Sequence, residues 1–184
     1  AAGFNLQHDV TADTAYAEYV IGAVDLPGQK DPRAFWVNKS VASLLDDSAP
    51  PNYTRYVKHL RQILLDDLGL KGKDILVLGA GGFTLSHREP LNRYTYVDID
   101  PAIRDIAEKH FLREPARGEF IADDARRFVA TSERRFDAVV VETDRVQHAG
   151  RGLDRPPGRV AGPRLSGDRL RQDAAQARYI DEPR

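Results

Sequence analysis

The chain has 184 residues, of which 41% are hydrophobic and 30% are charged, and its formal net charge is −1. This composition predicts a globular domain, and the near-zero charge argues against a general binder of nucleic acids or membrane surfaces. Cysteine is absent, which excludes disulfides, thiolate catalysis and Cys-based metal sites. No apolar run approaches the roughly 20 residues that span a bilayer, and no secretory signal is visible, so we expect a cytoplasmic protein. Methionine is absent even at position 1, so we expect the native chain to start elsewhere.

Residues 1–50 are predicted to form a small antiparallel β domain. Residues 14–24 and 34–45 carry Tyr, Val, Ile, Phe and Trp at a density typical of strands, and Gly28 and Pro32 interrupt the stretch between them. We expect two or three antiparallel strands here.

Residues 51–142 alternate between helix and strand patterns. Apolar residues recur at helical spacing over residues 53–68, with Gly69 as the expected C-cap, and short apolar runs typical of covered parallel strands follow. A helix is also expected directly after the glycines that end the first of these runs. The alternation predicts an α/β fold with a doubly wound, Rossmann-like, methyltransferase-type sheet. The predicted strands are residues 74–79, 94–100, 118–123 and 136–142, and the further predicted helices are residues 101–110 and 124–132.

Residues 143–184 form a tail of different composition. They hold nine Arg, five Gly and four Pro but no Lys, and six of them are Val, Leu or Ile. This favours an irregular, solvated segment over further core strands, so we expect the C-terminal strands of the sheet to be missing or atypical. A shifted reading frame after codon 142 would explain the abrupt change.

A glycine turn ends the first predicted strand of the sheet. Gly79, Ala80, Gly81 and Gly82 allow the backbone to turn sharply and to approach a ligand closely. A helix after the turn would present a positive N-terminal end. A dinucleotide fingerprint would need a further glycine where the chain has Thr84, so the match to NAD-type binding is incomplete. A purely structural turn is the alternative.

Acidic residues end the second strand. Asp98 lies 19 residues beyond Gly79, where a carboxylate could accept hydrogen bonds from both hydroxyls of a ribose. The alternative for Asp98 is a solvated strand end. Asp100, followed by Pro101, is better explained as a helix cap than as a ligand-binding group.

Carboxylates also end the third and fourth strands. Asp123 and Asp124 stand where a strand meets a helix, and either could accept a hydrogen bond from an adenine amino group or cap the helix. Glu142 ends the fourth strand. In an open parallel sheet the ligand lies outside the carboxyl ends of the strands, and Glu142 could accept a proton from an amine there.

Four segments together resemble the class I S-adenosylmethionine-binding fold and, within it, the spermidine synthase (polyamine aminopropyltransferase) family. They are the glycine motif at 75–87, the acidic motif at 96–111, and residues 121–129 and 134–142. The N-terminal β region also fits, because these enzymes carry a small β domain before the sheet. The resemblance covers residues 12–142.

The resemblance implies a site for S-adenosylmethionine or its decarboxylated form. Glu142 would take the place of the family's catalytic Asp, which helps to deprotonate the attacking amine, and Tyr53 is the second catalytic candidate. The sulfonium is a good leaving group, so no metal is required. The implied cofactor-binding residues are Gly79, Ala80, Gly81, Gly82, Asp98, Ile99, Asp123, Asp124 and Ala125.

The chain also departs from the family pattern. Ala42 stands about where the family has Gln, and Thr54 and Arg55 replace the His and Glu of its Tyr-His-Glu motif. After Glu142, nothing resembles the family's gate loop or its remaining strands.

The leading interpretation is aminopropyl transfer from decarboxylated S-adenosylmethionine to a diamine such as putrescine, a step of polyamine biosynthesis. The alternatives are a methyltransferase that acts on an unknown acceptor and a non-catalytic scaffold relative. The expected partner is a small-molecule amine, with no nucleic acid and no membrane. The five His are scattered without ligand spacing, which argues against a metal site. A four-stranded sheet would leave an edge strand unpaired, which favours a homodimer.

Overall fold

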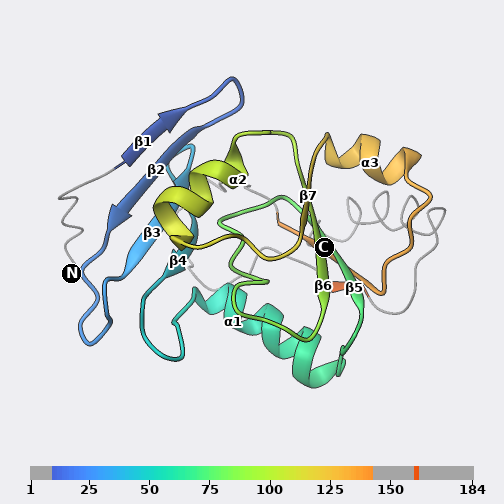
Figure 1. Cartoon of the computed structure of the whole chain (residues 1–184), viewed down its shortest axis with the longest axis horizontal. Coiled ribbons are helices and arrows are strands. Elements are labelled where there is room, and N and C mark those ends of the chain that lie inside the picture. The colour runs from blue at the N-terminus through green and yellow to red at the C-terminus, as the bar shows by residue number, and fades with distance from the viewer. Residues whose placement is uncertain (1–9, 143–159, 162–184) are drawn as a thin grey trace, which may run out of the picture.

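The computed structural model describes residues 10–142 and 160–161, which form two β-sheets (Figure 1). An antiparallel sheet has the order β1-β2-β3-β4, and a larger sheet has the order β7-β6-β5-β8-β9. The bounds of the first sheet are β1 (Val10–Asp13), β2 (Glu18–Ala23), β3 (Arg33–Val37) and β4 (Ser40–Leu45). The bounds of the second are β5 (Asp74–Leu78), β6 (Arg93–Asp98), β7 (Glu119–Ala122), β8 (Ala138–Val141) and β9 (Val160–Ala161).

The antiparallel character of the N-terminal region is confirmed, but it has four strands rather than two or three. Asn38 and Lys39 both adopt positive φ angles, of 46° and 67°, and make a tight turn between β3 and β4. Two-residue hairpins need this backbone geometry, which usually brings glycine into the turn. Because the turn has no glycine, residues 34–45 read as one strand in the sequence.

The second sheet contains the four predicted parallel strands, and β9 adds a fifth. β5 pairs in parallel with β6 and β8, and β6 pairs in parallel with β7. The two-residue β9 pairs antiparallel with β8, so the tail adds one short strand, which agrees with the expectation that the C-terminal strands are missing or atypical. Two residues are too few for a period-two pattern, so the sequence carried no signal for it. β9 thereby covers the edge of β8 that was expected to be open, and the homodimer stays a prediction.

Within the described residues, three helical segments accompany the sheet. α1 (Arg55–Arg61) continues into the π-helical η1 (Gln62–Asp67), and Gly69 follows with φ of 58°, as a C-terminal cap requires. α2 (Ile103–Ile106) continues into the π-helical η2 (Ala107–Leu112), and α3 (Ala125–Thr131) precedes β8.

The helix expected after the glycine turn does not form. Residues 81–88 make consecutive turns, such as the hydrogen bonds from Phe83 N to Ala80 O (2.9 Å) and from His87 N to Thr84 O (3.3 Å). Phe83 has a positive φ of 58°, which a right-handed helix cannot include. The hydroxyl of Ser86 also donates to Arg117 O (2.7 Å), which holds the segment in its irregular path. The positive helix end proposed for ligand binding is therefore absent from this loop.

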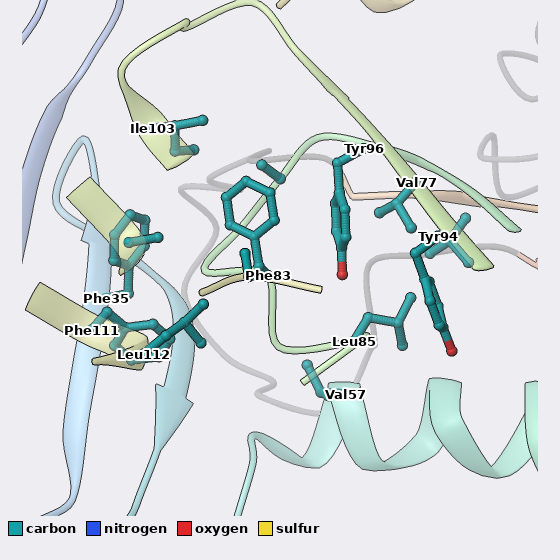
Figure 2. Packing of buried hydrophobic residues seen from close by; sticks show 14 of the residues in the cluster. Phe35, Val57, Val77, Phe83, Leu85, Tyr94, Tyr96, Ile103, Phe111 and Leu112 are labelled. Atoms are coloured by element: carbon teal, nitrogen blue, oxygen red, sulfur yellow. The ribbon is translucent and has the colours of Figure 1, made fainter. Parts of the chain in front are cut away.

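The buried apolar residues join both sheets in one core. Figure 2 shows Phe35 of β3, Val57 of α1 and Phe83 of the turn segment in the same cluster as Phe111. The rings of Phe35 and Phe111 lie 5.4 Å apart. A second cluster, which includes Phe128 of α3, packs on the opposite face of the sheet. The sheet is thus covered on both faces, as its continuous apolar strands predict.

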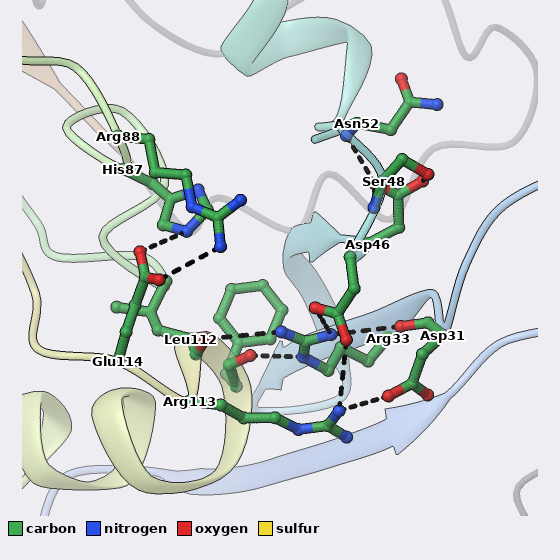
Figure 3. A network of polar contacts seen from close by, with 12 residues as sticks. Asp31, Arg33, Asp46, Ser48, Asn52, His87, Arg88, Leu112, Arg113 and Glu114 are labelled. Atoms are coloured by element: carbon green, nitrogen blue, oxygen red, sulfur yellow. Dashed lines mark hydrogen bonds and ion pairs between the residues drawn. The ribbon is translucent and has the colours of Figure 1, made fainter. Parts of the chain in front are cut away.

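Polar contacts also link the two sheets. Arg33 of β3 is 2% exposed and donates to the backbone oxygen of Phe111 at the end of η2, and it pairs with Asp47 (2.8 Å; Figure 3). Arg113 beside it pairs with Asp31. These links hold the antiparallel sheet against η2, and the division of the chain at residue 50 stays a prediction.

Candidate functional site

Four parallel strands end at one edge of the second sheet, which we call the carboxyl edge. Backbone hydrogen bonds tie the ends of neighbouring strands together, for example from Gly79 N to Val97 O (2.8 Å) and from Glu142 N to Leu78 O (2.8 Å). Asp123 N donates to Asp98 O (2.9 Å). The glycine turn and the predicted acidic residues are therefore brought together, as parallel strands require.

The glycines of the turn lie against Glu142. Gly79 has a φ of 94°, and a Cβ there would stand 2.6 Å from the backbone oxygen of Glu142. Gly81 has a φ of 49°, and a Cβ there would overlap Oε2 of the Glu142 side chain. Gly82 instead packs on Phe111 in the core. Gly79 and Gly81 thus allow the end of β8 to approach the turn, and the Glu142 carboxylate lies beside the turn.

Asp98 connects β6 to the glycine turn. Its Oδ2 accepts a hydrogen bond from Ala80 N (2.9 Å), and its Oδ1 accepts one from Asp100 N (3.0 Å). Burial raises the pKa of Asp98, although these backbone hydrogen bonds act against the shift. A backbone hydrogen bond from Ile99 also acts against the shift. Because an ionised carboxylate has about four acceptor positions, capacity remains for a hydrogen bond from a ligand. The N–H of Ala80 is already used by Asp98, so Ala80 would meet a ligand through other atoms.

Asp100 has a different role from Asp98. It is 1% exposed and accepts hydrogen bonds from Tyr19 OH (2.6 Å), Thr14 Oγ1 (2.5 Å) and Ala102 N (3.0 Å). Burial alone would raise the pKa of Asp100, but these hydrogen bonds outweigh burial and hold the pKa below its ordinary value. The N-cap of α2 is Ala102 and no side chain caps this helix, so the predicted capping by Asp100 is wrong: Asp100 instead bonds to Ala102 N in the turn that Pro101 and Ala102 form before the helix begins. The bonds to the N-terminal sheet were not predicted.

A pocket of about 310 Å³ opens beside the ends of β6 and β7. Three predicted residues, Ile99, Asp123 and Asp124, line it. Sequence reasoning missed its other lining residues, which are Tyr16, Pro101, Ala122 and Arg127. Ala125 is the first residue of α3 and follows Asp124 directly. Tyr16 lies more than 80 residues before the other lining residues. The sequence therefore marked it only as an aromatic residue in an expected strand.

Arg127 holds the two carboxylates that begin α3. Oδ1 of Asp124 accepts from Arg127 N (2.9 Å) and caps the helix, as one of the two predictions for this residue states. Asp123 pairs with the Arg127 guanidinium one turn further along. Both acids thus have structural partners and also line the pocket, where their remaining lone pairs can accept further hydrogen bonds.

Tyr53 lies in a buried polar network away from the residues that line the pocket. Its hydroxyl contacts His87 Nδ1 (2.8 Å), and the guanidinium of Arg61 stands 4.4 Å from its ring centre. His87 Nε2 pairs with Glu114 (2.8 Å), which Arg88 also contacts (3.2 Å; Figure 3). Burial lowers the pKa of His87, although the charge of Glu114 acts against the shift. The catalytic assignment of Tyr53 stays a prediction.

Tyr56, the second residue of α1, was missed. Its hydroxyl is buried and finds no hydrogen-bond partner within residues 10–142 and 160–161. Burial raises the pKa of Tyr56, and the negative charge of Glu142 raises it further. Tyr53 lies before α1 in a β-bridge to Leu45, so the two tyrosines do not share a helix face, and the sequence marked Tyr56 only as one of the apolar residues at helical spacing.

The part of the chain that the structure describes has neither a cluster of metal-binding side chains nor a membrane-spanning helix. In that part of the chain no group of three or more His, Asp or Glu side chains is placed to hold a metal ion. No helix among the same residues is long and apolar enough to cross a membrane.

The curated proteins that match the chain include two that align with about 80–90 of its residues. No protein-family model matches. The eEF1A lysine and N-terminal methyltransferase homolog of Drosophila pseudoobscura pseudoobscura is 36% identical over 93 residues, which are 46% of this chain and 14% of that protein. The polyamine aminopropyltransferase of Sulfurisphaera tokodaii is 35% identical over 79 residues, which are 37% of this chain and 26% of that protein. The chain thus spans about a quarter or less of these relatives.

Solved structures match a larger share of the chain. A probable spermidine synthase from Corynebacterium glutamicum aligns with a TM-score of 0.53 and 20% identity, over 71% of this chain and 50% of that one. A spermidine synthase in complex with the transition state analogue AdoDATO aligns with a TM-score of 0.52 and 12% identity, over 77% of this chain and 48% of that one.

The chain has the spermidine synthase fold. The predicted fold class and the family resemblance are thereby confirmed at the level of the fold. The chain spans about half the length of these spermidine synthase structures.

Proposed function

We propose that the carboxyl edge binds an adenosyl sulfonium, and that the protein transfers an aminopropyl group from decarboxylated S-adenosylmethionine to a diamine such as putrescine. The observation that carries this proposal is the position of Asp98. Its carboxylate joins the glycine turn to the end of β6, next to Ile99 of the 310 Å³ pocket. This arrangement supports a nucleoside whose ribose hydroxyls bond to Asp98 and whose base enters the pocket.

The remaining predicted residues would contact other parts of the ligand. Asp123 or Asp124 would accept a hydrogen bond from the adenine amino group at the pocket wall. Gly79 and Gly81 would run beside the sulfonium side of the ligand, close to Glu142.

Glu142 would act as the proton acceptor. The diamine must lose a proton before its nitrogen lone pair can attack the propyl carbon next to the sulfonium. The new C–N bond forms as the C–S bond breaks, and the bonding electrons stay on sulfur as the neutral thioether of methylthioadenosine. Glu142 takes the proton that the amine releases. Tyr56 is better suited than Tyr53 to position the amine there, because its buried hydroxyl interacts with Glu142.

Methyl transfer is the second candidate. The 93-residue match to a methyltransferase homolog favours it, because that match is longer than the 79-residue match to an aminopropyltransferase. In that reaction the acceptor attacks the methyl carbon and S-adenosylhomocysteine leaves, with the same nucleoside contacts.

Calorimetry with decarboxylated S-adenosylmethionine, S-adenosylmethionine and methylthioadenosine tests the proposal. Preference for the decarboxylated ligand supports aminopropyl transfer, and preference for S-adenosylmethionine supports methyl transfer. If none of the three binds, both transfers fail and a non-catalytic scaffold remains.

Two variants of Asp98 test the ribose contact. Asp98→Ala should abolish nucleoside binding. Asp98→Asn keeps an acceptor for one backbone amide and should weaken binding on the order of 10- to 100-fold, since hydrogen bonds to charged groups contribute about 1.5–3 kcal/mol. Asp74→Asn, at the opposite end of the sheet, is the matched control and should bind normally. Unchanged affinity in both Asp98 variants would refute the ribose assignment.

A further inference from the structure

The turn between β1 and β2 is fixed to the carboxyl edge. Thr14 Oγ1 donates to Oδ2 of Asp100 (2.5 Å) and accepts from the backbone N–H groups of Tyr16 (3.1 Å) and Ala17 (3.1 Å). Thr14 N also donates to Ala17 O (3.0 Å). The turn therefore has a defined conformation and a defined position against the end of β6, although it belongs to the other sheet.

This position brings Tyr16 to the pocket beside Ile99. Both side chains line the pocket, yet Tyr16 is 52% exposed and Ile99 is 49% exposed. Apolar side chains that are exposed singly on a surface are normal. Two that line the same pocket indicate instead a surface that a ligand covers. Asp123 and Asp124 add hydrogen-bond acceptors to these apolar walls.

We propose that Tyr16 stacks on the base of the adenosyl ligand, so that the β1–β2 turn forms a wall of the nucleobase site and selects a base with an exocyclic amino group. This inference rests on the proposed nucleoside binding and extends it to a residue outside the Rossmann-like sheet. An aromatic ring stacks on any base, while the carboxylates accept hydrogen bonds and so require a donor on the base edge. The combination favours adenine over hypoxanthine, which presents a carbonyl where adenine has its amino group.

Four variants measured by calorimetry with methylthioadenosine test the stacking. Tyr16→Ala should weaken binding on the order of 5- to 100-fold, from the usual strength of base–aromatic stacking. Tyr16→Phe keeps the ring and should stay within about 2-fold, whereas Tyr16→Leu keeps apolar bulk without the ring and should resemble the Ala variant. Val41→Ala is the matched control, since Val41 is 47% exposed on β4 of the same sheet, and it should bind normally.

A spectroscopic readout separates stacking from a structural role of the side chain. Proton NMR of bound methylthioadenosine should show the base H2 and H8 signals shifted upfield by the ring current of Tyr16. The shift should persist in Tyr16→Phe and disappear in Tyr16→Leu. Methylthioinosine should bind the unaltered chain at least about 10-fold more weakly than methylthioadenosine, because its carbonyl oxygen would face a carboxylate oxygen where adenine donates a hydrogen bond.

The outcomes distinguish this inference from the proposed function. If Tyr16→Ala binds methylthioadenosine normally while Asp98→Ala does not bind it, the stacking alone is overturned. Equal affinity for the two nucleosides would overturn the amino-group selection. Failure of the unaltered chain to bind any adenosyl ligand would overturn the proposed function and the inference with it.

Discussion

Asp98 at the carboxyl edge of the parallel sheet is held differently from the ion-paired acids of the amino edge. At the amino edge, where the strands begin, Arg93 bonds to Asp74 (2.7 Å and 3.0 Å) and Arg134 pairs with Glu119 (2.9 Å). At the carboxyl edge, Asp98 accepts from the backbone amides of Ala80 and Asp100 instead. Acids at the amino edge therefore pair with cations, while Asp98 accepts hydrogen bonds from neutral donors.

The size of a hollow does not by itself separate the two edges. The amino edge has a hollow of about 370 Å³, larger than the 310 Å³ pocket of the carboxyl edge, and arginine–carboxylate pairs line both hollows, with Asp123–Arg127 in the smaller one. Exposed ion pairs contribute little and offer few groups to a ligand. Burial raises the pKa of Asp98, because its carboxylate is less solvated than an exposed carboxylate.

Glu142→Gln should have the largest effect on the carboxyl edge. Glutamine has nearly the same shape but cannot accept the amine proton, so the rate of aminopropyl transfer should fall about 10²- to 10⁴-fold. Methylthioadenosine affinity should change by less than about 2-fold, because Glu142 would face the amine rather than the nucleoside. Steady-state assays of transfer and calorimetry together measure both. An unchanged rate would exclude Glu142 as the proton acceptor.

Gly79→Ala should be the most destabilising change at this edge. The positive φ costs about 1–2 kcal/mol for alanine, and overlap of the new Cβ with the Glu142 backbone oxygen adds about 1–3 kcal/mol. Gly28→Ala is the matched control, because Gly28 has a φ of 78° but no atom within 4 Å of the new Cβ. The Gly28→Ala variant should lose only the free energy that the positive φ costs. If both variants lose the same free energy of unfolding in urea, the close approach of β8 to the turn contributes nothing.

Asp100→Ala should destabilise the fold by about 2–3 kcal/mol, because Thr14, Tyr19 and Ala102 lose a charged acceptor. Since the folded-state pKa of Asp100 is lowered, its stabilisation is complete above the unfolded pKa near 3.9 and is lost as pH falls through the folded value. The stability difference between the unaltered chain and Asp100→Asn should therefore shrink below about pH 4. A difference independent of pH would contradict this account. Asp105→Ala, an exposed acid on α2, is the control.

Glu119→Gln should have the smallest effect and defines the other side of the comparison. Its pair with Arg134 is exposed, so unfolding free energy should change by no more than about 0.5 kcal/mol and ligand affinity not at all. Thermal unfolding and calorimetry provide the measurement. A clear loss of nucleoside binding would mean that the amino edge also takes part in the site.

Particular residues show how far sequence reasoning reached. The strands of the parallel sheet and the cap at Asp124 were predictable, because apolar periodicity and capping depend on neighbours in the chain. The helix after Gly82 was predicted wrongly, because the positive φ of Phe83 and the bonds of Ser86 depend on distant segments. The role of Asp100 was predicted wrongly, because α2 begins two residues later than expected and the bonds from Thr14 and Tyr19 come from the other sheet.

The sequence by itself determined the alternating α/β pattern and brought glycines and acids to one edge of a sheet, since parallel strands share their direction wherever they pack. Only the tertiary structure decided that Asp100 is fully buried and Asp98 only partly buried. The two side chains are chemically identical, and they differ in the segments that pack on them. The tertiary structure also brought Tyr16 to the pocket beside Ile99, and it brought Tyr56 near enough to Glu142 for that charge to raise the pKa of Tyr56. Such contacts arise when the two sheets share one core, and no local pattern records them.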